Sequence, residues 1–135
     1  MNAVDNISIA DSKFATISKF MEFKPKIQAA LNRQQGEGFT FDMVFDLLIN
    51  GRVLFFWNDT SCVVGEFRNY PEGIHAHIFL AAGNLEGLEE LFTSLGPWAK
   101  SQGAIKATTL CRKGFKRALR KSGWVETQVW LTKEL

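Results

Sequence analysis

The sequence predicts a single α/β domain whose mixed, mostly antiparallel sheet carries helices on both faces. Two observations predict this fold class. The chain has 135 residues, which suits one domain. Its apolar residues have helical spacing over residues 12–50 and strand-like alternation over residues 53–82, and the two patterns then alternate to the C-terminus. We therefore expect a helical N-terminal segment over residues 1–38 and a core over residues 40–135.

The first part of the chain has three helical patterns. Residues 12–23 place apolar side chains three and four positions apart, which predicts an amphipathic helix that Pro25 interrupts. A second short helix is expected over residues 25–32. Thr40 stands at an N-cap position before the third helix, and Asn50–Gly51 has the composition of its C-terminal end.

Three strands are expected next. Residues 53–57 and 62–67 are short runs of β-branched and aromatic residues separated by Asn58–Asp59–Thr60, which predicts an antiparallel hairpin. Residues 74–82 predict a third strand, with alternate side chains on opposite faces. We expect Ile74, Ala76, Ile78 and Leu80 on one face, and His75, His77 and Phe79 on the other.

The remainder alternates between helix and strand. A long helix is expected over residues 85–102 and a strand over residues 104–110. A short basic helix follows over residues 113–121, then a turn at Ser122–Gly123 and a final strand over residues 124–132. Strand–helix–strand crossovers of this length are typical of parallel pairing in the same sheet.

Composition narrows the class of protein. Hydrophobic residues make up 46% of the chain and charged residues 22%, which is too apolar for a disordered protein. The net charge of +2 does not by itself indicate a nucleic-acid partner, and we find neither a membrane-length apolar run nor a signal peptide. Cys62 and Cys111 lie in apolar stretches without metal-site spacing, so we expect buried free thiols in a reducing compartment.

Several short segments occur in a recognisable order between Thr40 and the last residue, Leu135. They are Leu47–Gly51 before the first strand, Tyr70–Pro71 before the third, Trp98–Lys100 with Gly103, Arg112–Leu119, and Gly123–Trp124. In this order, from Thr40 to Leu135, the chain resembles small members of the GNAT N-acetyltransferase superfamily that tailed bacteriophages and prophages encode. The resemblance rests on the joint order of these segments, because none of them is a catalytic signature alone.

The resemblance implies an acyl-CoA N-acyltransferase-like fold and transfer of an acetyl group from acetyl-CoA to an amine. It also implies a phage-encoded protein in the cytoplasm of a bacterial host, with acetyl-CoA and an amine acceptor as partners. The alternative is a catalytically inactive protein of this fold in a phage virion, such as an internal or head–tail component that binds other phage structural proteins. A shared fold does not decide between the two.

In the family, the pyrophosphate of acetyl-CoA lies on backbone amides at the start of the long helix. The resemblance places Gly83, Asn84 and Gly87 there, although the usual glycine-rich pattern is not matched and Glu86 adds a negative charge. A plain helix start is the alternative interpretation. Arg112 and Lys113 belong to a basic segment that continues to Lys121. This segment is interpreted as a contact for the CoA phosphates, as a surface for nucleic acid or an acidic protein, or as a solvated helix face.

Acetyl transfer requires a group that accepts the proton of the amine and a group that protonates the thiolate. His75 and His77 share one face of the strand that borders the acyl site in the family, and Glu66 on the preceding strand is a further candidate base. Ordinary strand surface is the competing interpretation for all three. The family's tyrosine acid is replaced by Leu119, four residues before Gly123.

Overall fold

The computed structural model describes residues 9–33, 38–111 and 113–135. Five helices and four strands are assigned in these residues. In chain order they are α1 (Ile9–Glu22), α2 (Lys24–Arg33), α3 (Phe41–Ile49), β1 (Leu54–Trp57), β2 (Ser61–Tyr70), β3 (Gly73–Gly83), α4 (Leu85–Ser101), β4 (Ala104–Thr109) and α5 (Lys113–Arg120). Each of these elements lies within a few residues of its predicted position.

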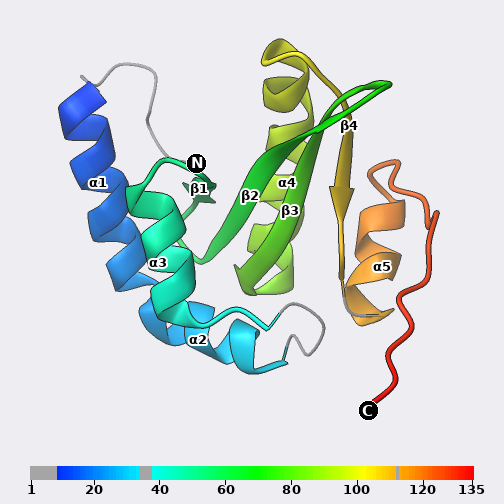
Figure 1. Cartoon of the computed structure of the whole chain (residues 1–135), viewed down its shortest axis with the longest axis horizontal. Coiled ribbons are helices and arrows are strands. Elements are labelled where there is room, and N and C mark those ends of the chain that lie inside the picture. The colour runs from blue at the N-terminus through cyan, green and yellow to red at the C-terminus, as the bar shows by residue number, and fades with distance from the viewer. Residues whose placement is uncertain (1–8, 34–37, 112) are drawn as a thin grey trace.

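The strands form one sheet in the order β1-β2-β3-β4. The first two pairings are antiparallel and the β3–β4 pairing is parallel, which confirms the predicted mixed sheet. In Figure 1 the helices α1 to α3 lie on one side of the sheet, and α4 covers the other. Both α4 and α5 begin at the edge where β3 and β4 end.

Each face of the sheet has its own apolar core. Phe20 and Ile27 of the N-terminal helices are fully buried against Phe55 and Val64 on one face. On the opposite face Leu91 and Phe92 of α4 pack with strand residues such as Phe56, Val63 and Ile78. The three consecutive aromatic residues of β1 thus point alternately into both cores, as the pleat of a strand requires.

A β-bulge interrupts β3. Val64 of β2 is opposite Leu80, whereas the next residue, Gly65, is opposite Ile78, so Phe79 is the extra residue of the bulge. The bulge shifts the alternation by one position, and Leu80 packs in the same core as Phe79. The expectation that Leu80 shares a face with Ile78 is therefore wrong.

The pairing of β3 with β4 covers only the first half of β3. Residues 74–78 pair with residues 104–109, and the Thr109 hydroxyl donates a hydrogen bond of 2.8 Å to the carbonyl of Ile78 at the last paired position. Beyond this point β3 continues from Leu80 to Gly83 with β2 as its only strand neighbour among the described residues. The pairing stops because β4 ends at Thr109, and the chain beyond it separates from the end of β3 (Figure 1).

Two further expectations are corrected. Residues 124–132 have the alternation of a strand but form none, because alternation favours a strand only where a neighbouring strand supplies hydrogen bonds. The thiol of Cys62 is buried as expected, whereas Cys111 is exposed because it follows the end of β4 instead of lying in an apolar layer. None of the described helices combines the length and apolar character needed to cross a membrane.

Candidate functional site

A row of polar side chains crosses the sheet where β3 and β4 are still paired. Glu66 of β2 is the cross-strand neighbour of His77, and His77 is the neighbour of Thr108 in β4. The ring nitrogen Nδ1 of His77 is 2.8 Å from the Thr108 hydroxyl oxygen, so the two are hydrogen-bonded. The parting of β3 and β4 begins two residues further along β3.

His77 is buried without a complete set of partners. Its exposed fraction is 6%, and its Nε2 atom has no hydrogen-bond partner among the described residues. Burial, followed by the positive charge of Arg68, lowers the pKa of His77 to about 4, while Glu66 acts in the opposite direction. The ring is therefore neutral at pH 7. When Nδ1 donates its proton to Thr108, Nε2 presents a lone pair.

His75 has a different environment, although it lies on the same strand face. Its Nε2 is 2.7 Å from a carboxylate oxygen of Glu72, and its ring lies 4.4 Å from that of Tyr70. Glu72 also accepts hydrogen bonds from Lys106, and the bonds from Lys106 and His75 lower the pKa of the Glu72 carboxyl. His75 is thus engaged in a surface cluster, whereas His77 has a buried nitrogen without a partner among the described residues.

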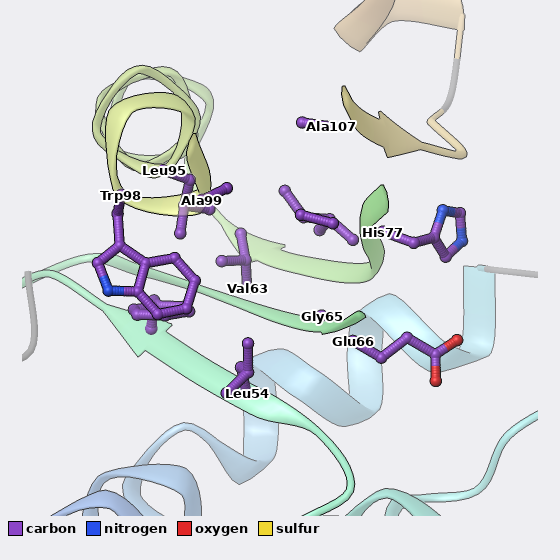
Figure 2. Close-up of a pocket in the computed structure, with 12 residues that line it drawn as sticks. Leu54, Val63, Gly65, Glu66, His77, Leu95, Trp98, Ala99 and Ala107 are labelled. Carbon is purple, nitrogen blue, oxygen red and sulfur yellow. The ribbon is translucent and has the colours of Figure 1, made fainter. Parts of the chain in front are cut away.

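Glu66 is half-buried and paired within its own strand. The Nε atom of Arg68 donates a hydrogen bond of 2.8 Å to its carboxylate. Figure 2 shows the side chains of Glu66 and His77 projecting away from the apolar cavity that they border. Both carboxylate and imidazole therefore belong to the polar row and not to the packing under α4.

The cavity lies between α4 and the sheet. Its side-chain lining is apolar and includes Leu54, Val63, Leu95, Trp98 and Ala107 (Figure 2). Its volume is about 30 Å³, which is room for about one water molecule and too little for an acetylated thiol arm. It is a gap in the packing, so we do not place a substrate there.

At the N-terminus of α4, Asn84 is the cap. Its side-chain oxygen accepts a hydrogen bond of 2.8 Å from the amide of Gly87, and its carbonyl accepts one from Leu88. The first four amides of a helix have no partner within the helix, so the amides of Leu85 and Glu86 remain available. In the described part of the chain no protein group accepts from these two.

Gly83 and Gly87 are explained by packing within the chain. A Cβ atom on either glycine would overlap Thr60, in the turn between β1 and β2, and Ser61, the first residue of β2. This turn is fastened to α4 by three hydrogen bonds. Asn58 donates to the carbonyl of Gly87, Thr60 to the Asn84 side chain, and Ser61 to the Asn84 carbonyl. The space beside these glycines is thus filled by protein.

The remaining sequence-predicted residues are placed as follows. Arg112 lies outside the described residues, and Lys113 begins α5 at the edge where β3 and β4 part. Leu119 is buried in the core under α4, and Tyr70 lies partly exposed at the opposite end of the sheet. A cluster of three or more metal-ligating side chains is absent from the described residues.

The geometry can be compared with known proteins. The chain matches, over 90% of its length and 90% of theirs, an aminoglycoside acetyltransferase from an uncultured soil metagenomic sample in complex with sisomicin, at 14% identity and a TM-score of 0.66. It also matches a predicted acetyltransferase with acetyl-CoA from Clostridium acetobutylicum at 13% identity, with a TM-score of 0.62 and coverage of 89% and 90%. The chain has the acetyltransferase fold.

A third structure with the acetyltransferase fold is glucosamine-6-phosphate N-acetyltransferase from Arabidopsis thaliana. It is 13% identical, has a TM-score of 0.59, and the match covers 85% of this chain and 92% of that one. No protein-family model matches the sequence, and no curated protein matches it. At these identities the likeness shows the fold alone. None of the three structures indicates an acceptor for this chain.

Sequence reasoning missed Thr108 and the contact of Asn58–Ser61 with the start of α4. Alternation along residues 104–110 limits which side chains share a face, but the register that places Thr108 beside His77 depends on how two strands 31 positions apart align. The sequence did predict the turn itself, at Asn58–Asp59–Thr60. Its contact with the start of α4 joins residues 24 and 29 positions apart, for which the sequence carries no local signal.

Proposed function

We propose that this protein is an N-acetyltransferase that transfers the acetyl group of acetyl-CoA to an amine. The observation that carries the proposal is the end of the β3–β4 pairing at Ile78, one residue beyond His77, a buried histidine whose Nε2 atom has no hydrogen-bond partner among the described residues. The acetyltransferase fold supports the reaction class. The acceptor is an amine whose identity the acetyltransferase fold does not determine.

Acetyl-CoA fits the gap because its arm carries amide groups. The residues of a strand direct their N–H and C=O groups to its two edges in alternation, so part of the backbone over residues 80–83 faces the side that β4 has left. An extended amide-containing arm pairs with such an edge as an added strand does. This arrangement brings the thioester toward the polar row of Glu66, His77 and Thr108.

We place the phosphate end of acetyl-CoA at the starts of α4 and α5. The free amides of Leu85 and Glu86 and the dipole of the 17-residue helix α4 favour an anion. Asn84, Gly83 and Gly87 shape this helix start through their contacts with Thr60 and Ser61, and do not form an open cradle themselves. Lys113 opens α5 at the same edge. Arg112 precedes it in the sequence, and both residues carry a positive charge. The Glu86 carboxylate opposes the binding of phosphate.

In the proposed reaction the amine nitrogen bonds to the acetyl carbon, the C–S bond breaks, the amine loses a proton and the thiolate gains one. His77 Nε2 is buried, so in the proposed reaction a neighbouring side chain moves before this atom accepts a hydrogen bond from the amine and orients the amine's lone pair. A ring with a pKa of about 4 is a weak base, so the proton passes on to the Glu66 carboxylate or to water. Because Leu119 is buried where the family has its tyrosine, water protonates the thiolate.

Binding is tested by titrating the purified protein with acetyl-CoA in a calorimeter. Glu86→Lys replaces a repelling charge beside the free amides, and we expect it to tighten binding several-fold. Glu90→Lys, one turn further along α4, is the matched control and should have a smaller effect. Gly83→Glu is unsuitable as a test, because its side chain would overlap Ser61. Absence of binding at millimolar acetyl-CoA would overturn the proposal.

Chemistry is tested by measuring release of the free CoA thiol with a panel of primary amines. We expect His77→Gln to lower the rate at least tenfold with unchanged acetyl-CoA affinity, because His77 is placed beside the amine and not beside the phosphates. His75→Gln is the control, since His75 is engaged with Glu72. Equal rates in the two variants would remove His77 from the mechanism.

A second candidate is a catalytically inactive protein of this fold in a phage virion. It is favoured by the contact of Thr60 and Ser61 with Gly83 and Gly87, which fills space at the start of α4, and by the buried Leu119. In this case the protein binds other virion proteins instead of acetyl-CoA. Under either candidate we place the protein in the cytoplasm of a bacterial host, from which a virion component would be assembled. The calorimetric titration separates the two.

A further inference from the structure

The outer side of α5 carries a row of positive charges. The side chains of Ala118 and Leu119 are buried, and Phe115 packs against the core under α4. Because side chains three and four positions apart share one side of a helix, the other residues of α5 face away from this core. The basic residues there are Lys116, Arg117, Arg120 and, directly after α5, Lys121. We call these four residues the basic face.

The charges of the basic face are largely uncompensated. No acidic residue occurs in the sequence of α5. The Lys116 ammonium pairs with the Glu126 carboxylate at 3.3 Å, whereas the exposed side chains of the other three form no ion pair with the residues that the structure describes. Like charges three and four positions apart on a helix repel one another. An anion bound across the basic face removes this repulsion.

A glycine lies beside the basic face. Gly114 is exposed and precedes Arg117 by one helical turn, so the two lie on the same side of α5. A Cβ atom at Gly114 would meet no atom within 4 Å, so packing within the chain does not require a glycine there. Glycine also destabilises a helix relative to alanine. Its presence leaves the helix backbone accessible to a ligand that lies along the basic face.

The composition of this surface favours one class of ligand. The exposed residues of α5 and of the turn after it include neither an apolar nor an acidic side chain. A protein partner is held mainly by buried aromatic or apolar anchors, and a membrane-binding helix inserts an apolar side, which in α5 is buried in the protein. A phosphate backbone requires only cations, and arginine binds a phosphate group through two hydrogen bonds.

We propose that the basic face binds the phosphate backbone of a nucleic acid without preference for base sequence. The regularly spaced negative charges of a nucleic acid complement a row of cations that has no apolar or acidic member. Contacts to phosphates position a nucleic acid but carry no sequence information. The proposal does not depend on acetyl transfer, because no residue of the basic face belongs to the polar row or to the helix starts at which we place the phosphates of acetyl-CoA.

Binding is measured by the fluorescence anisotropy of a labelled DNA duplex of mixed sequence, titrated with the full chain. We expect four phosphate contacts to lower the affinity roughly 100-fold when the salt concentration rises from about 50 mM to about 200 mM. A second duplex of unrelated sequence should bind with the same affinity. Absence of binding to both duplexes at the lower salt concentration would overturn the proposal.

The basic face is tested by combining Arg117→Gln, Arg120→Gln and Lys121→Gln in one variant. It should bind the duplex at least tenfold more weakly at low salt and with a smaller salt dependence, because one of the four cations remains. The side chains are exposed, so the variant should keep the circular dichroism spectrum and melting temperature of the folded chain. Arg117→Lys combined with Arg120→Lys keeps the charge and should retain most of the affinity.

The matched control removes three exposed cations from the N-terminal part of the chain, through Lys13→Gln, Arg33→Gln and Arg52→Gln. It changes the net charge by the same amount and should bind the duplex almost as tightly as the unaltered chain. Equal losses in the two triple variants would overturn the proposal, because binding would then follow net charge alone. Displacement of the duplex by polyglutamate at the same charge concentration, or binding to phosphatidylserine vesicles but not to the duplex, would overturn it as well.

Discussion

His77 is neutral at physiological pH because its surroundings disfavour the charged ring more than Glu66 favours it. The loss of hydration on burial and the nearby Arg68 guanidinium both act in this direction. The hydrogen bond to Thr108 holds the ring with Nε2 free, which is the property that the proposed function uses. The same surroundings therefore keep the ring neutral and leave Nε2 without a partner among the described residues.

This environment predicts a specific pH dependence of stability. Below pH 6.5 the ring of the unfolded chain takes up a proton, whereas the folded ring does so only near pH 4. The free energy of unfolding therefore falls between pH 7 and pH 4, by up to about 3 kcal/mol from this residue. We expect His77→Gln to lose this part of the dependence and His75→Gln to retain it, as measured by urea unfolding at pH 7 and pH 4.5. Parallel curves for the wild type and His77→Gln would contradict the assignment.

At the scale of elements, the start of α4 lies between the ends of β3 and β4 and the turn that joins β1 to β2. Its N-terminus stands where β3 and β4 part, and its start is fixed by hydrogen bonds to the turn between β1 and β2. Gly87 is required there because Thr60 and Ser61 occupy the space of a side chain. The turn and the helix start consequently behave as one unit.

We expect Gly87→Ala to lower the free energy of unfolding by about 2 kcal/mol, because the added methyl group forces the turn away from the helix. Gly114→Ala in α5 is the matched control. A Cβ at Gly114 would meet no atom within 4 Å, so this change should stabilise the chain by up to about 1 kcal/mol through helix propensity. Chemical denaturation of both variants measures the difference. Equal changes in the free energy of unfolding would show that the turn leaves room for a side chain at position 87.

At the scale of the whole molecule, the sheet separates two apolar cores of unequal packing. The core under α1 to α3 encloses Ala82, which is 1% exposed, whereas the layer under α4 contains the gap of about 30 Å³ bordered by Ala76. The two alanines lie on the same strand, on opposite sides of the bulge at Phe79. Substitutions at these two positions therefore compare how tightly the two layers are packed in the same protein.

Ala76→Val should raise the free energy of unfolding by about 0.5–1 kcal/mol, since its methyl groups fill part of the gap and valine favours a strand. Ala82→Val should lower it by about 1–3 kcal/mol through overpacking of a closed layer. Thermal and denaturant unfolding at pH 7 give both values. A destabilising Ala76→Val would indicate that the gap closes in solution.

The sequence by itself determined the order and type of nearly all the elements and the placement of His75 and His77 on one strand face, because these features depend on residues close together in the chain. Tertiary structure decided the bulge that moves Leu80 to the other core, the alignment of Thr108 with His77, and the occupation of the space beside Gly83 and Gly87. It also decided that residues 124–132 are not a strand within this chain. These outcomes depend on contacts between residues distant in sequence, and a hydrophobic pattern specifies which face a side chain prefers but not which partner meets it.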